Sequence, residues 1–139
     1  MEANLEIKIH QGLGDLHFGM QIEDVIQKLG KATDIEVLDD VEEIQTTVLH
    51  YSDLGIALFF DGNSPVLKCI DIYNEDTLIS GQKVFEKNKQ EVVAIMRELK
   101  FFEEDIEEEL WGEKRVTFVE ANIDFFFEED ELVSIVFGK

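Results

Sequence analysis

The chain has 139 residues, of which 45% are hydrophobic and eleven are Phe, so it can bury the core of one ordinary domain. Its 32 Asp and Glu residues outnumber its 12 Lys and Arg residues, which gives a formal net charge of −20. This charge repels the phosphates of nucleic acids and anionic membrane surfaces, so it argues against both as partners and favours a basic protein.

The first half of the chain predicts a strand, a helix and three further strands. Leu5, Ile7 and Ile9 alternate with polar residues, as in a half-buried strand. Apolar residues then follow helical spacing over about 21–29, and Gly30 stands where such a helix ends. Three strand-like runs follow, at Gln45–Tyr51, Gly55–Phe60 and Val66–Tyr73. The turn-rich sequence DGNSP joins the last two as a hairpin.

The glycines before the helix do not form a nucleotide-binding loop. A dinucleotide loop needs Gly-x-Gly-x-x-Gly, but Gly12, Gly14 and Gly19 are spaced differently, and His17 occupies the third position. The sequence Gly-Lys-Ser/Thr of a phosphate-binding P-loop is absent as well. The stretch therefore predicts the start of a structural helix.

The second half resembles the first at a shift of 67 residues. The shift places Val25 on Val92 and Phe60 on Phe127, and the matches fall on helix-stripe and strand positions. Asn88 and Glu91 predict the cap of the second helix. We expect a single domain over 1–139, with repeat one at about 12–76 and repeat two at about 79–139.

The stretch GDLHFGMQIEDVIQKLGKA and the later YSDLGIALFFD and LKCIDIY resemble a known family. They are similar to β-lactamase-inhibitor-protein-like repeats, which also occur in small outer-membrane-assembly lipoproteins of the SmpA/OmlA type. Gln21 and Ala32 depart from the Ser/Thr and Pro of that pattern. The resemblance implies an α+β fold of two helix-plus-antiparallel-meander repeats, with the helices on one face of an antiparallel sheet. It also implies protein binding on the opposite face, and no chemistry.

The sequence selects no catalytic or metal site. Cys69 is the only thiol, and its counterpart in the second half is Ser134, which favours a small strand residue over a nucleophile. The three His residues show no short ligand spacing, and DGNSP lacks the order of a calcium loop. We therefore expect a protein that is not an enzyme and that needs no cofactor or metal.

The alternation of the strands instead indicates a binding face. If Phe60 and Phe127 point to the helices, then Phe59 and Phe126 point the other way. A Phe surrounded by polar residues is typical of an anchor at a protein interface. The predicted partner-binding residues are His50, Phe59, Asp71, Tyr73, Thr117, Asp124, Phe126 and Val136. Trp111 is either a further anchor or part of the core.

Our first hypothesis is an acidic, non-enzymatic protein-interaction module, such as a bacterial inhibitor or immunity-type protein that binds a basic partner. The alternative is a small-ligand-binding protein or a hydrolase that uses a carboxylate cluster near His50. A homodimer through the Phe59 and Phe126 face is a third alternative. Because the start MEANLEIKIH lacks the pattern of a secretion signal, we expect a cytoplasmic protein.

Overall fold

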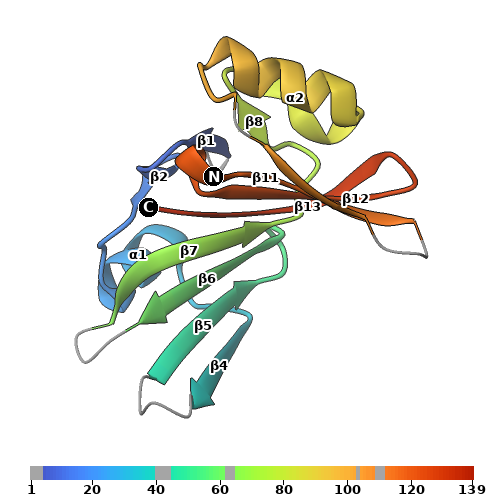
Figure 1. The fold of residues 1–139 in the computed structure, drawn as a ribbon. Coiled ribbons are helices and arrows are strands. Elements are labelled where there is room, and N and C mark those ends of the chain that lie inside the picture. The colour runs from blue at the N-terminus through green and yellow to red at the C-terminus, as the bar shows by residue number, and fades with distance from the viewer. Residues whose placement is uncertain (1–4, 40–44, 62–64, 103, 109–111) are drawn as a thin grey trace.

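The fold was analysed in a computed structural model of the chain, which describes residues 5–39, 45–61, 65–102, 104–108 and 112–139. In these residues the chain forms an eight-stranded antiparallel sheet and a smaller sheet of five short strands (Figure 1). Two α-helices accompany the sheets.

The large sheet is assembled from two runs of four consecutive strands. Its order is β10 (Asp105–Glu108), β11 (Glu113–Phe118), β12 (Ile123–Glu128), β13 (Glu131–Gly138), β7 (Val66–Ile72), β6 (Ile56–Asp61), β5 (Gln45–Tyr51) and β4 (Asp34–Asp39). Within each run, every strand pairs with its neighbour in sequence. The two runs meet where β13 pairs with β7, with Phe137 opposite Ile70.

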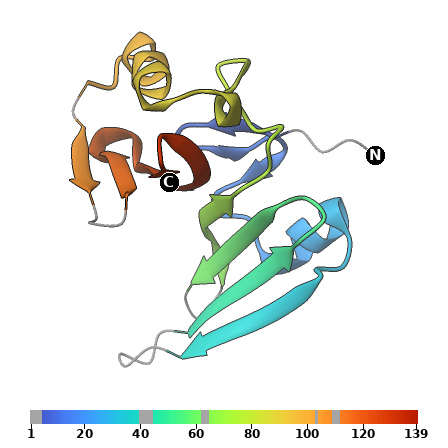
Figure 2. The ribbon, with the colours of Figure 1, turned by 90° about the vertical axis from the view of Figure 1, so that its right-hand side faces the viewer.

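The small sheet lies between the two helices (Figures 1 and 2). Its order is β3 (Leu16–His17), β2 (Gly12–Leu13), β1 (Glu6–Lys8), β8 (Leu78–Ile79) and β9 (Gln82–Lys83). The parallel pairing of β1 with β8 sets Ile7 opposite Ile79 and ties the start of the chain to its middle.

The helices form where the sequence predicts them. α1 spans Ile22–Leu29 and buries Val25 completely, and Gly30 follows it with a φ of 83°. α2 spans Lys89–Glu98, and the Asn88 side chain accepts a hydrogen bond of 3.0 Å from the backbone N–H of Glu91. The cap is therefore confirmed. Two short 3-10 helices cover Val84–Glu86 and Val119–Ala121.

The pleat of the large sheet separates a buried face from a half-exposed one. Phe60 and Phe127 are 0% and 1% exposed and belong to the core cluster that also contains Val25 and Val92 of the two helices. Their neighbours Phe59 and Phe126 are half-buried, and pleating directs them to the opposite face. In both strands the register shifts between the two Phe residues. The predicted burial of Phe60 and Phe127 is confirmed, and the higher exposure of Phe59 and Phe126 agrees with the predicted alternation.

A glycine allows the last strand to lie close to its neighbours. Gly138 pairs with Cys69 of β7. A Cβ at this position would lie 2.7 Å from Asn122 Nδ2 and 3.1 Å from the carbonyl oxygen of Lys68. Any larger residue would therefore push β13 away from β7 or displace the Asn122 side chain.

The expected fold class is wrong. We expected an α+β fold of helix-plus-meander repeats with the helices on one face of a single antiparallel sheet, but strands dominate the described chain and form two sheets. The strand predicted from Leu5, Ile7 and Ile9 is present as β1, but the other four strands of the second sheet were missed because they have two residues each, too few to show a period of two. The fold is β-rich, with two helices of eight and ten residues.

The two buried Phe residues should carry much of the stability of the large sheet. Phe60→Ala or Phe127→Ala should lower the free energy of unfolding by about 3–5 kcal/mol, because each leaves a cavity in a closed core. Phe59→Ala and Phe126→Ala should cost no more than about 1–2 kcal/mol, since these side chains are only partly removed from water. Urea unfolding of the four variants tests this order, and equal losses at all four positions would contradict the register.

Candidate functional site

The half-exposed face of the large sheet, here called the outer face, is the candidate site. One continuous register row crosses all eight strands of this face. It contains Asp34, His50, Ala57, Asp71, Val136, Asp124, Thr117 and Asp105, from β4 to β10. Because residues opposite each other share a face, the row brings together side chains that lie up to 71 positions apart in the sequence (105 − 34).

The centre of the row holds a partly buried carboxylate, that of Asp71. Asp71 lies on β7 between Ala57 and Val136, which cannot donate to it from their side chains. Its Oδ1 is buried and has no hydrogen-bond partner in the described residues. Burial raises the pKa of Asp71, while the nearby His50 lowers it. A buried acceptor without a partner is costly, and a cationic or N–H donor from another molecule would satisfy it.

The neighbouring thiol is kept in its protonated form. Burial, together with the negative charges of Asp71, Asp124 and Asp61, raises the pKa of Cys69 to about 11, while a backbone hydrogen bond from Ile70 acts in the opposite direction. Since the thiolate is the reactive species, Cys69 is a poor nucleophile near neutral pH.

The flanks of the row are held by short polar contacts. His50 Nε2 lies 3.0 Å from Glu36 Oε1 on the edge strand. On the other side, Thr117 Oγ1 donates to Asp124 at 2.5 Å. These contacts hold the side chains of three predicted site residues, His50, Thr117 and Asp124. Side chains that are already held in place lose less conformational freedom when a protein binds.

An arginine on this face was missed by the sequence analysis. Arg115 pairs with Phe126 across β11 and β12, and its guanidinium lies 2.9 Å from Glu107. Its Nε is buried and has no partner in the described residues. The period of two that placed Thr117 on the outer face also places Arg115 there, so the signal was present in the sequence.

Seven of the eight predicted residues, all except Tyr73, belong to the outer face, but they do not form one compact cluster. His50, Asp71, Val136, Asp124 and Thr117 share the central row. Phe59 pairs with Cys69 on one side of that row, and Phe126 pairs with Ser134 on the other. From strand spacing and rise, the two rings are on the order of 20 Å apart. Tyr73 follows β7 and is 49% exposed, and Trp111 lies outside the described residues.

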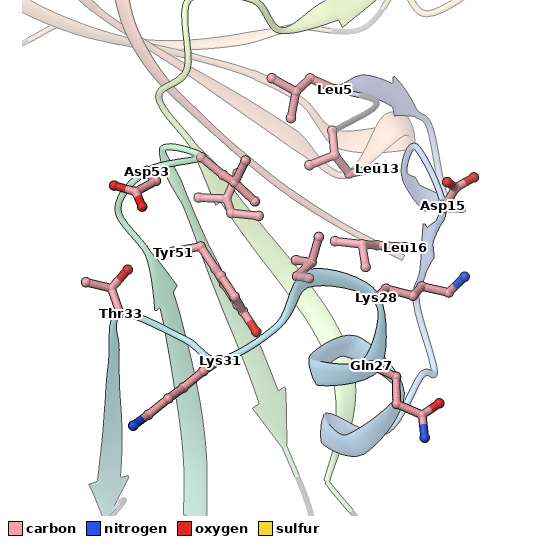
Figure 3. Close-up of a pocket in the computed structure, with 13 residues that line it drawn as sticks. Leu5, Leu13, Asp15, Leu16, Gln27, Lys28, Lys31, Thr33, Tyr51 and Asp53 are labelled. Carbon is pink, nitrogen blue, oxygen red and sulfur yellow. The ribbon is translucent and has the colours of Figure 1, made fainter. Parts of the chain in front are cut away.

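The pocket in Figure 3 belongs to a different part of the molecule. It has a volume of about 590 Å³ and lies between α1, the first strands and the end of β5. Leucines at positions 5, 13, 16, 29 and 54 line it together with Tyr51 and Ile56. Asp15, Lys28 and Asp53 are among the polar residues around it.

The phenol of Tyr51 is the pocket group whose surroundings are best defined. Burial raises the pKa of Tyr51, and its hydroxyl already donates to the carbonyl oxygen of Gly30 at 2.8 Å. A second pocket of about 640 Å³ lies beside Tyr73 and the start of α2. Neither pocket is lined by His50 or Asp71. Within the described ranges no group of three or more His, Cys, Asp or Glu residues could hold a metal ion.

Comparison with known proteins gives one distant structural likeness. No known sequence family and no curated protein matches the chain. A solved structure of an extracellular protein containing an SCP domain, from Bacillus anthracis str. Ames, is similar with a TM-score of 0.50. The two sequences are 14% identical, and the match covers 87% of this chain but 43% of that one. At this identity the likeness concerns the fold alone.

The expected cytoplasmic location is wrong on this comparison, because the structurally similar protein is extracellular. The expectation was based only on the first ten residues, MEANLEIKIH, which lack the pattern of a secretion signal. Among the helices that the structure describes, none is long and apolar enough to span a membrane.

The thiol on the outer face gives a direct test of its electrostatics. In the folded protein, the rate of Cys69 alkylation should keep rising up to about pH 11, because the raised pKa delays formation of the thiolate. Asp71→Asn removes one of the charges that raise this pKa and should move the profile to lower pH. Identical profiles for folded and urea-unfolded protein would contradict this arrangement of charges.

Proposed function

We propose that the protein is a non-enzymatic interaction module whose outer face binds a basic protein. The observation that supports this most directly is Asp71, a carboxylate in the middle of an open sheet face with a buried oxygen that nothing in the described chain satisfies. A lysine or arginine of a partner would supply both the missing hydrogen bond and the opposite charge.

The charge of the whole face supports a basic partner. Carboxylates occur on most strands of this face, whereas the fixed positive charge at the paired positions is that of Arg115, which is already engaged by Glu107. The acidic residues at these positions include Asp34, Glu36, Asp61, Asp71, Asp105, Glu107 and Asp124. Complementary charge mainly increases the rate of association and selects against acidic partners.

Phe59 and Phe126 would serve as two separate anchors for such a partner. Each is half-buried on the outer face, and the carboxylate row lies between them. Aromatic side chains that lose their remaining exposed surface on binding are typical hot spots. An inhibitor or immunity-type protein would use a face of this kind to cover a basic surface.

The alternative of a hydrolase or ligand-binding protein built around His50 has less support. Small-molecule sites are concave and bury most of their ligand. His50 lines neither of the two pockets, and its imidazole is held by Glu36. A homodimer through the outer face would bring two acidic rows together, which the charge disfavours.

The proposal predicts specific retention of a basic protein at low salt. Immobilised wild-type protein should retain it, and the D71N/D124N double variant should lose it. E23Q/E98Q is the matched control, because it removes the same charge from exposed helix positions and should retain the partner. Equal losses in both double variants would indicate nonspecific attraction, and no salt-sensitive retention by the wild type would overturn the proposal.

The aromatic anchors can be tested on the complex obtained in this way. Phe126→Ala should weaken binding by about tenfold or more, with little loss of fold stability, because hot-spot truncation costs more than about 1 kcal/mol of binding energy. Val133→Ala, a nearby exposed position, should change affinity much less. Calorimetric titration of both variants would measure this difference, and equal affinities would exclude Phe126 as an anchor.

A further inference from the structure

The edge strand β4 carries three exposed apolar side chains at an end of the large sheet. It is the last strand of the eight-stranded sheet, and no described strand pairs with its outer side. Ile35 and Val37 are each 55% exposed, and Leu38 is 44% exposed. An edge strand leaves backbone N–H and C=O groups available for pairing, and proteins usually protect such edges with charge or by shortening the strand.

The opposite edge of the same sheet has that protection. β10 has four residues, against six in β4, and three of the four are acidic. Glu107 and Glu108 form ion pairs with Arg115 and Lys114 of the neighbouring strand, at 2.9 and 3.1 Å. Ile106 is its one apolar residue. β4 therefore presents three exposed apolar side chains at its edge where β10 presents one, Ile106.

The two sides of β4 differ in chemistry. Asp34 and Glu36 pair with His50 and Val48, and so lie on the outer face with the acidic row. Ile35 and Val37 pair with Leu49 and Thr47 and lie on the opposite face. Leu38 pairs with Thr46 and shares the outer face with the two carboxylates. A strand added beside β4 would therefore meet Asp34, Glu36 and Leu38 on the outer face, and Ile35 and Val37 on the other.

We propose that β4 accepts an extended segment of a partner protein as a ninth strand, and that this segment alternates basic and apolar residues. Its basic side chains lie beside Asp34 and Glu36, its apolar side chains cover Ile35 and Val37, and its backbone pairs with the open edge. Main-chain hydrogen bonds supply affinity in this mode of recognition, and the alternating side chains supply specificity. A second copy of this chain is a poor occupant, because each copy carries a net charge of −20 and the same two carboxylates.

This edge is far from the Phe126 anchor of the proposed function, whereas Phe59 on β6 is separated from it by β5 alone. Phe126 lies on β12, and four strands of the sheet (β13, β7, β6 and β5) separate it from β4. Asp34 and Glu36 belong to both surfaces, so the two proposals are distinguished by Phe126 and Val37. Phe126→Ala should leave binding at β4 unchanged, and Val37→Lys should leave the contribution of the Phe126 anchor unchanged.

A short acetylated peptide that alternates lysine and valine tests the proposal with the intact protein. It should bind saturably and shift the backbone amide resonances of residues 34–39 more than those of β10. Val37→Lys should weaken binding by about tenfold, because it replaces an apolar contact with a repelling charge. Val37→Ile, which keeps the apolar surface, and Phe126→Ala, on the distant anchor, should leave the affinity unchanged.

Three results would overturn the proposal. The first is equal binding by the same peptide with alternate amides N-methylated, since that peptide keeps its charge but cannot extend the sheet. The second is an equal loss of peptide affinity in Ile106→Lys on β10, which would show that the peptide does not distinguish the β4 edge from the opposite edge of the sheet. The third is a dimer of the protein alone that Val37→Lys dissociates, which would show that a second copy occupies the edge.

Discussion

The pairing of β7 with β13 is the contact on which the rest of the structure depends. These strands come from different halves of the chain, and their antiparallel register unites two four-stranded meanders into one sheet. Ile70, Ile72, Ile135 and Phe137 lie on the buried side of the pair. Gly138 permits the close approach at its end. Without this pairing, each half would expose a central strand as an apolar edge.

The same pairing creates the electrostatic centre of the outer face. Strands in the middle of a wide sheet are shielded from water even on their exposed side, so Asp71 on β7 is partly buried although it faces outward. Its unsatisfied oxygen and raised pKa therefore result from its position in the sheet. Sites that conflict with folding alone are often sites selected for binding, which is why this carboxylate has the central place in the proposed interaction.

The sequence analysis anticipated several periodic elements, but it missed the six-residue strand β4 as well as the short strands. The helix ending at Leu29 and the strand Gln45–Tyr51 were anticipated because several apolar residues repeat at the proper spacing. β8 and β9 have two residues each and depend on pairing with the distant start of the chain, so no local pattern reveals them. For the same reason, alternation identified the face on which Asp71 lies, but not its missing partner. That property depends on which residues the register places beside it.

Native-state hydrogen exchange of the β7 and β13 amides tests the central claim, that the two halves form one continuous cooperative sheet. Amides in the paired segments 70–72 and 135–137 should exchange only through global unfolding, with the same free energy in both strands. The edge strands β4 and β10 should exchange sooner, through local opening. If the paired segments exchanged at different free energies, or as readily as the edges, the two halves would open independently and the account would be contradicted.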